Sequence, residues 1–221
     1  MDSATKSRRS AENRLGAIGG RLLDKLKYDI RFARHRLFDN FEFVHINRTG
    51  GTSIVKALGL PFEHKTAQEI IGRIGQDQWD RRFSFAFVRN PWDKVVSHYH
   101  HRVQINLTEL GVKTIPFNAW VRQTYRDQNP AYYRPPLMFA PQLDWISGRD
   151  GTLLVDFVGR FEALDRDFAT VAGRIGRTVS LPHLNSSIHK RYQEYYDDEA
   201  ANIIAAWFRK DIDAFGYTYD G

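Results

Sequence analysis

Short apolar runs alternate with segments of helical periodicity along most of the chain. Runs of strand type lie at Phe41–Ile46, Phe83–Val88 and Leu153–Val158, and helical stretches separate them. Strands that alternate with helices favour a parallel sheet whose crossovers are helical. The pattern therefore predicts an α/β fold with three layers, in which a central parallel sheet is flanked by helices.

Residues 1–38 form a basic arm, and we expect residues 39–221 to form a single domain. The first 20 residues or so are polar, basic and glycine-containing, which predicts a flexible segment. From Arg21 to Phe38, spacings of three and four give one apolar helical stripe: Leu23, Leu26, Ile30, Ala33 and Leu37. This stripe either packs on the domain or on a partner subunit, which leaves room for a homodimer, or lies on an anionic membrane.

The segment Phe41–Ser53 reads FEFVHINRTGGTS, an apolar strand that runs into a basic turn and then a helix expected from Thr52. Gly50 and Gly51 allow the backbone to approach a ligand closely. Free N–H groups and the positive end of the helix dipole stabilise an anion at such a turn. Arg48 adds a charge, and Thr49, Thr52 and Ser53 add hydroxyl donors. The alternative is a solvated loop that only caps a helix.

A second turn of the same kind follows Phe83–Val88. Arg89 comes at the carboxyl end of that strand, Asn90 is a candidate cap, and Pro91 suits the first helical position. Asp93 stands where a capping-box acid would. Ser97 falls in the second turn of the helix, so Arg89 and Ser97 are placed to bind one phosphate between them. Alternatively, Arg89 pairs with a carboxylate and Ser97 is only a small helical residue.

The pair HINRTGGTS and FAFVRNPWDKVVS resembles the phosphosulfate and 3′-phosphate motifs of PAPS-dependent sulfotransferases, in particular the family 2 carbohydrate type of bacteria and of the Golgi. Further segments resemble the family in order: His64–Ala67, Gln142–Trp145, Val155–Glu162, Leu181–Ser187 and Asp211–Tyr217. The resemblance implies a P-loop-like fold, PAPS as donor with PAP as product, no metal, and a carbohydrate or glycolipid hydroxyl as acceptor. It assigns the nucleotide to Asn47, Arg48, Thr49, Gly50, Gly51, Thr52, Ser53, Arg89 and Ser97.

The chain departs from this family at Arg48, where Lys is usual, and at Asn47, where Pro is usual. Arg stays protonated near neutral pH, so a proton-donating role does not carry over. Stabilisation of the leaving phosphate by charge remains available. We therefore expect Arg48 to act as a catalytic residue by charge and hydrogen bonding.

A base is needed to take the proton of the acceptor hydroxyl, and His64 is the first candidate. It precedes a predicted helix with Thr66 and Glu69 at capping-box spacing. A structural or surface histidine is the alternative interpretation. Weaker base candidates are His100, His101, Asp144 and Glu162, whereas His45 is expected to be structural.

Composition and charge narrow the classes of function. The chain of 221 residues contains no Cys, which excludes thiol catalysis, and no apolar run is long enough to span a bilayer. We expect a cytoplasmic enzyme, peripheral to a membrane if the basic arm binds lipid. The net charge of +6 lies wholly in residues 1–36, which hold ten Lys or Arg against four Asp or Glu. The domain is therefore neutral overall and lacks the broad basic surface of a nucleic-acid-binding protein.

Two other functions stay open. A P-loop kinase or other NTPase is one, because the apolar run that ends at Asp156 resembles a magnesium-binding strand, although the turn at Arg48 lacks the Walker pattern. A non-catalytic nucleotide-binding module is the other. The irregular stretch from Thr108 to Ile146 is expected to wall the acceptor cleft with Tyr125, Tyr132, Tyr133, Arg134 and Trp145, or else to place these aromatic residues in the core.

Overall fold

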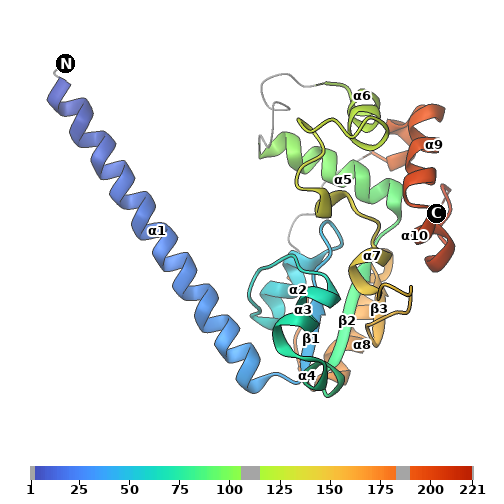
Figure 1. The fold of residues 1–221 in the computed structure, drawn as a ribbon, viewed down its shortest axis with the longest axis horizontal. Coiled ribbons are helices and arrows are strands. Elements are labelled where there is room, and N and C mark those ends of the chain that lie inside the picture. The colour runs from blue at the N-terminus through green and yellow to red at the C-terminus, as the bar shows by residue number, and fades with distance from the viewer. Residues whose placement is uncertain (1–2, 106–114, 183–189, 221) are drawn as a thin grey trace. The chain divides into compact units, whose positions relative to one another are not determined.

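The computed structural model describes residues 3–105, 115–182 and 190–220 (Figure 1). The predicted acceptor wall at residues 108–114 and most of the family-like segment Leu181–Ser187 lie outside the described residues. The chain divides into two compact units, one of residues 1–39 with 58–62 and one of residues 40–57 with 63–221. The predicted boundary after residue 38 stays a prediction.

The first unit is built on helix α1, which spans Ser3–Phe38. The segment predicted to be flexible is thus helical from Ser3 on, so this expectation was wrong. Arg34 holds the helix to residues 58–62 by donating to the carbonyls of Leu58 at 2.9 Å and Gly59 at 3.1 Å. Leu23, Leu26 and Ile30 of the apolar stripe are each more than half exposed.

Three parallel strands form the sheet of the second unit, in the order β1 (Phe41–Val44), β2 (Phe83–Val88) and β3 (Phe157–Arg160). Phe41 pairs with Phe83, and Phe85 pairs with Phe157. β2 matches its predicted run, and β1 begins as predicted but ends two residues earlier, at Val44. The third begins four residues later than predicted, because Asp156 turns to accept hydrogen bonds from the backbone and hydroxyl of Ser84 at 2.8 Å.

Helices cover both faces of the sheet, as the sequence predicts. On one face, Val44, Ala86 and Val88 pack with α3 (Ala67–Ile74) and with Trp145 of α7 (Leu143–Ile146). On the other face, Arg174 at the end of α8 (Leu164–Arg174) lies over the rings of Phe83 and Phe157. The expected α/β architecture, a central parallel sheet flanked by helices, is confirmed.

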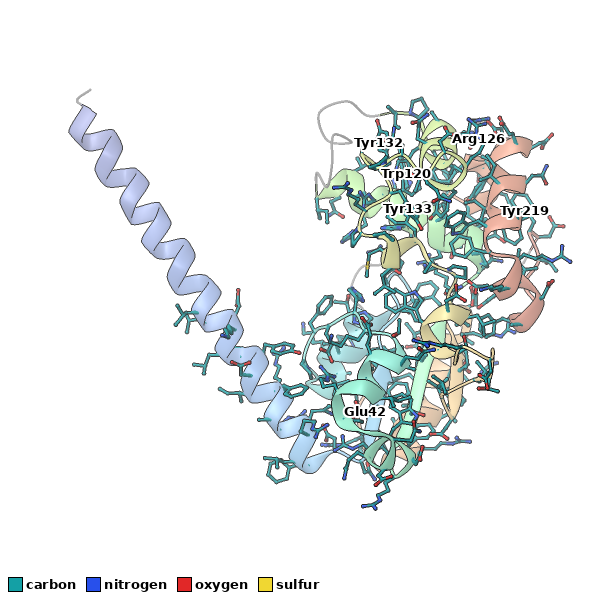
Figure 2. All side chains as sticks on the ribbon, in the orientation of Figure 1. Glu42, Trp120, Arg126, Tyr132, Tyr133 and Tyr219 are labelled. Atoms are coloured by element: carbon teal, nitrogen blue, oxygen red, sulfur yellow. The ribbon has the colours of Figure 1, made fainter. Side chains whose placement is uncertain are left out.

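The strands lead into the helices that carry the chemistry. β1 is followed by α2 (Gly51–Leu58), and β2 is followed by α5 (Pro91–Gln104). Around α5 lie α6 (Phe117–Val121), a π-helical turn (Arg122–Arg126) and α9 (Asp198–Trp207), where Trp120 and Tyr133 join an aromatic cluster (Figure 2). The remaining elements are α4 (Gln76–Asp80), α10 (Arg209–Phe215) and short 3-10 helices at Pro136–Phe139, Phe161–Ala163 and Tyr192–Tyr195.

Candidate active site

The turn between β1 and α2 has an unusual backbone at its charged residue. Arg48 adopts a φ of 66°, in the left-handed region, and Gly50 adopts a φ of 83°. A Cβ on Gly50 would lie 2.8 Å from a methyl group of Leu164, and a Cβ on Gly51 would lie 2.1 Å from the ring of His45. Both glycines are therefore required by space, and the left-handed arginine is strain of the kind that collects at functional sites.

The turn is tied directly to α5. Arg48 donates from Nε at 3.0 Å and from Nη2 at 2.7 Å to the hydroxyl oxygen of Ser97. Ser97 is 1% exposed. The two segments that resemble nucleotide motifs thus meet at one hydrogen-bonded pair, although 49 residues separate them along the chain.

Arg89 supports this arrangement from the end of β2. It donates from Nη1 to the carbonyl of Arg48 at 3.1 Å and from Nε to Asp93 at 2.7 Å, and it lies 4.0 Å from the ring centroid of Phe161. Asp93 is thus an ion-pair partner, as the alternative interpretation of Arg89 had it. Asn90 caps α5 through Trp92, with Pro91 at the first helical position, which confirms both predictions. The direct phosphate contact expected of Arg89 stays a prediction.

Segments from the second half of the chain hold Arg89 and Asn90 in place. Gln142 accepts from the N–H of Arg89 at 2.9 Å and donates to its carbonyl at 2.8 Å. Asp211 in turn accepts from the backbone and the side chain of Gln142. Glu162 accepts from the N–H of Asn90 at 2.6 Å. Sequence reasoning missed these positioning roles, although Gln142, Glu162 and Asp211 all belong to the family-like segments.

Sequence reasoning also missed Lys94, one helical turn before Ser97 on α5. Its side chain is 2% exposed. Burial, opposed by the charge of Asp211 and assisted by the positive charges of Arg89 and Arg48, lowers the pKa of Lys94 to about 8. Burial followed by the charge of Arg89 likewise lowers the pKa of Arg48 to about 10, so both groups are cationic at neutral pH.

His64 lies next to the turn through His45. Its Nδ1 is 2.8 Å from the carbonyl oxygen of His45, and the two rings are 4.3 Å apart. Since a carbonyl only accepts, Nδ1 carries the hydrogen and Nε2 is the acceptor nitrogen of the ring. Burial keeps the pKa of His64 below its ordinary value, so the ring is neutral at pH 7. The predicted capping box of Thr66 and Glu69 is confirmed at the helix that follows.

The remaining predicted site residues lie in the β1–α2 turn, at the start of α2 or at the surface. The hydroxyl of Thr49 donates to the carbonyl of Ile46 at 2.9 Å inside the turn, and its assignment to the nucleotide stays a prediction. Asn47 donates to the carbonyl of Met138 at 3.0 Å. Thr52 is exposed and Ser53 is buried at the start of α2. Asp144, a weaker base candidate, pairs with Lys210 at the surface.

A pocket of about 590 Å³ lies beside the carboxyl-terminal half of α5. Tyr133, Arg134 and three prolines line it together with Arg102 and Gln128. Arg102 donates to the carbonyl of Arg134 at 2.9 Å. Tyr125 and Trp145, also predicted to wall the acceptor cleft, are buried core residues instead.

Comparison with known proteins decides the family. The profile of the sulfotransferase family matches residues 39–218, most of the chain. The chain belongs to the sulfotransferase family. This membership confirms the family that the sequence resembles and supports sulfotransfer activity.

One protein sequence and one solved structure are similar to this sulfotransferase-family chain. An uncharacterized protein of Archaeoglobus fulgidus is 30% identical over 128 residues, which cover 57% of this chain and 94% of that protein. The crystal structure of a sulfotransferase from Alicyclobacillus acidocaldarius covers 79% of this chain and 93% of its own at 14% identity, with a TM-score of 0.44.

In the ranges that the structure describes, no three His, Asp or Glu side chains gather as a metal site would require. None of the helices described is both long and apolar enough to cross a membrane.

Proposed function

We propose that this member of the sulfotransferase family transfers the sulfuryl group of PAPS to a hydroxyl of a carbohydrate or glycolipid. The observation that carries the proposal is the hydrogen bonding of Arg48 to Ser97, which joins the β1–α2 turn to α5. A nucleotide with phosphate at both ends requires two anion sites side by side. The paired turns, with cations at each, supply them.

The turn fits an anionic group by its shape as well as by its charge. At Gly50 and Gly51 a Cβ would meet neighbouring side chains, so the backbone is close-packed from behind. Among the N–H groups of the first turn of α2, that of Ser53 donates to the carbonyl of Gly50 at 3.0 Å, whereas those of Gly51 and Thr52 precede this first bond. These donors and the guanidinium of Arg48 would hold the phosphosulfate, while Arg89 and Ser97 would hold the 3′-phosphate.

In the reaction proposed, the acceptor oxygen attacks sulfur, and the bond from sulfur to the bridging phosphate oxygen breaks. Nε2 of His64 takes the proton of the acceptor hydroxyl. Arg48 stabilises the negative charge that develops on the departing phosphate, and PAP is the product. One such preorganised donor contributes on the order of 100-fold to 1000-fold in rate.

The pocket beside α5 supports a carbohydrate acceptor. Its volume of about 590 Å³ falls in the range of small-molecule sites. Tyr133 and the prolines offer faces on which a sugar ring stacks, and Arg134 adds hydrogen-bond donors. The exposed stripe of α1, flanked by Lys27 and Arg34, supports a lipid-linked acceptor at a membrane surface.

A magnesium-dependent kinase is less well supported. The residue suspected of binding the metal, Asp156, accepts hydrogen bonds from Ser84 near the start of β2. The Arg48 turn follows the opposite, carboxyl end of the parallel strands. Four residues of strand separate Ser84 from Val88, roughly 13 Å at 3.3 Å per residue.

Calorimetry with PAP, and with ATP plus Mg²⁺, tests the donor. Micromolar binding of PAP without metal supports the proposal, and a preference for ATP with Mg²⁺ contradicts it. Transfer of labelled sulfate from PAPS to a glycan panel then tests catalysis. PAP binding without transfer to any glycan or glycolipid would favour the non-catalytic module.

A further inference from the structure

Lys94 is a buried cation that the protein itself does not neutralise. Its side chain is 2% exposed, and its Nζ lies 5.5 Å from the ring centroid of Phe208. Across the residues that the structure describes, no hydrogen bond or ion pair within 4 Å involves this ammonium. An ammonium carries three donors, and burying them without acceptors is costly.

The carboxylate that would be its counter-ion is committed elsewhere. Asp211 accepts from the N–H groups of Gln142 at 2.8 Å and Leu143 at 2.9 Å, and from the side chain of Gln142 at 3.1 Å. These bonds hold the segment that positions Arg89. The charge of Asp211 still favours protonated Lys94, but burial outweighs it.

The other groups that face Lys94 are cationic or neutral. They are Arg48 from the β1–α2 turn, Arg89 from the end of β2, His64 ahead of α3 and His98 from α5 itself. Burial lowers the pKa of both histidines, so they are uncharged above pH 7. Three cations therefore gather at the place where Arg48 bonds to Ser97, against two carboxylates: Asp211, and Asp93, which pairs with Arg89 at 2.7 Å.

We propose that Lys94 is an anion-binding residue of the donor site and that its ammonium contacts a phosphate or sulfate group of the bound nucleotide beside Arg48. The inference rests on the proposed function. The bound anion provides the hydrogen-bond acceptors that the ammonium of Lys94 lacks among the described residues. It also gives the site a titratable cation, which Arg48 is not at neutral pH.

A dependence of affinity on pH follows. Lys94 loses its proton near pH 8, and a bound anion favours the protonated form. Between pH 7.5 and 9 the phosphates of PAP are already fully ionised, since their second pKa is about 6. Arg48, with a pKa of about 10, is still protonated there. Above pH 8 the affinity for PAP should therefore fall by up to about tenfold per pH unit.

The test is the dissociation constant of PAP, measured by calorimetry from pH 6.5 to 9 on the full chain. We expect the fall above pH 8 in the native protein. K94R should keep the affinity and lose the fall, because arginine stays charged, and K94M should bind about tenfold or more weakly at pH 7 with a flat profile. K56M, which removes an exposed lysine of α2, is the matched control and should behave like the native protein.

The outcomes separate the two proposals. Micromolar PAP binding with a flat profile in the native protein, or the same slope in K94R, overturns the role of Lys94 and leaves the function standing. Absence of PAP binding at pH 7 overturns the proposed function itself. If K94M does not fold, K94R against the native protein still decides, since both carry a cation at pH 7.

Discussion

Replacement of Arg48 by Gly, Ala and Lys separates the strain at this residue from its chemistry. The residue has a φ of 66°, and its guanidinium donates twice to Ser97. A side chain in the left-handed region costs about 1–2 kcal/mol relative to glycine. Loss of the bonds to Ser97 costs about 1 kcal/mol net. Arg48→Ala keeps the strain and loses the bonds, so it should unfold about 1 kcal/mol more easily than the native protein.

Arg48→Gly also loses the bonds but relieves the strain. Glycine loses more conformational entropy on folding than alanine does, which offsets about 0.5–1 kcal/mol of the strain relieved. The glycine variant should therefore be more stable than the alanine variant by about 0.5–1 kcal/mol. Both should lose on the order of 100-fold to 1000-fold in turnover, because both lack the charge that stabilises the leaving phosphate. Arg48→Lys should retain much of the activity.

Urea denaturation of the three variants gives the stabilities, and transfer of labelled sulfate from PAPS at saturating substrates gives the turnover. Full activity of Arg48→Ala would refute the catalytic role of the charge. A glycine variant less stable than the alanine variant would refute the reasoning on strain. The two measurements are independent, so each half of the argument is tested by itself.

Four further predictions concern other parts of the chain. His64→Ala should lower turnover about 100-fold or more, and near-normal turnover of this variant would exclude His64 as the base. In the native enzyme the acid limb of the pH–rate profile should lie below pH 6.5, since burial lowers the pKa of His64. Gly51→Ala should impair PAP binding and stability together, because its Cβ would lie 2.1 Å from a histidine ring; calorimetry and melting curves that match the native protein would contradict this. The pKa of Lys94 is about 8 in the folded protein and 10.5 ordinarily, so between these values the unfolded chain binds more protons than the folded one. In that window this group makes the protein more stable as the pH rises, by at most about 3 kcal/mol. Denaturation of the native protein and of Lys94→Met at pH 7.5 and 9.5 measures this effect, and an equal response of both proteins would contradict it. Leu26→Glu combined with Ile30→Glu should weaken binding to vesicles rich in phosphatidylserine, since both side chains are more than half exposed; unchanged vesicle binding would contradict a membrane role, and loss of a dimer in sedimentation would assign the stripe to a partner subunit.

The turns after β1 and β2 could be predicted from the sequence because their signals are local. Asn90 and Pro91 start α5 where expected, and Thr66 starts α3 with its capping box. Each depends on residues within one helical turn. Hydrophobic alternation and capping chemistry are sufficient for such features. The sequence placed the turns of Arg48 and Ser97 after two parallel strands, and hence at the same edge of the sheet, but it did not predict the hydrogen bonds between these two side chains.

The third strand shows where local signals fail. The run Leu153–Val158 is apolar enough for a buried strand, yet Leu153 is 53% exposed and the strand begins at Phe157. Pairing is decided by the neighbouring strand. A Cβ at Gly159 would lie 2.5 Å from the ring of Phe87, so glycine is needed opposite that ring. Such complementarity between distant residues leaves no periodic trace in either segment.

Lys94 was missed for a related reason. A lysine in an amphipathic helix is normally solvated, and nothing within α5 shows that this one is buried. Its environment comes from Arg48, Arg89 and Asp211, which arrive from three other parts of the chain. The burial of this charge becomes evident only in the folded structure, where these three residues surround Lys94.

The same cluster explains why the family-like segments extend so far beyond the two turns. Three cations and two carboxylates, Asp93 and Asp211, gather there, so the cluster has an excess of positive charge that a bound anion would neutralise. The bonds of Gln142 to both backbone groups of Arg89, and of Asp211 to Gln142, keep the end of β2 in place against that repulsion. Gln142 and Asp211 can hold this geometry without touching the nucleotide. Binding of an anion should relieve the repulsion, so the stabilisation of the native protein by PAP should be larger than that of Lys94→Met at equal concentration.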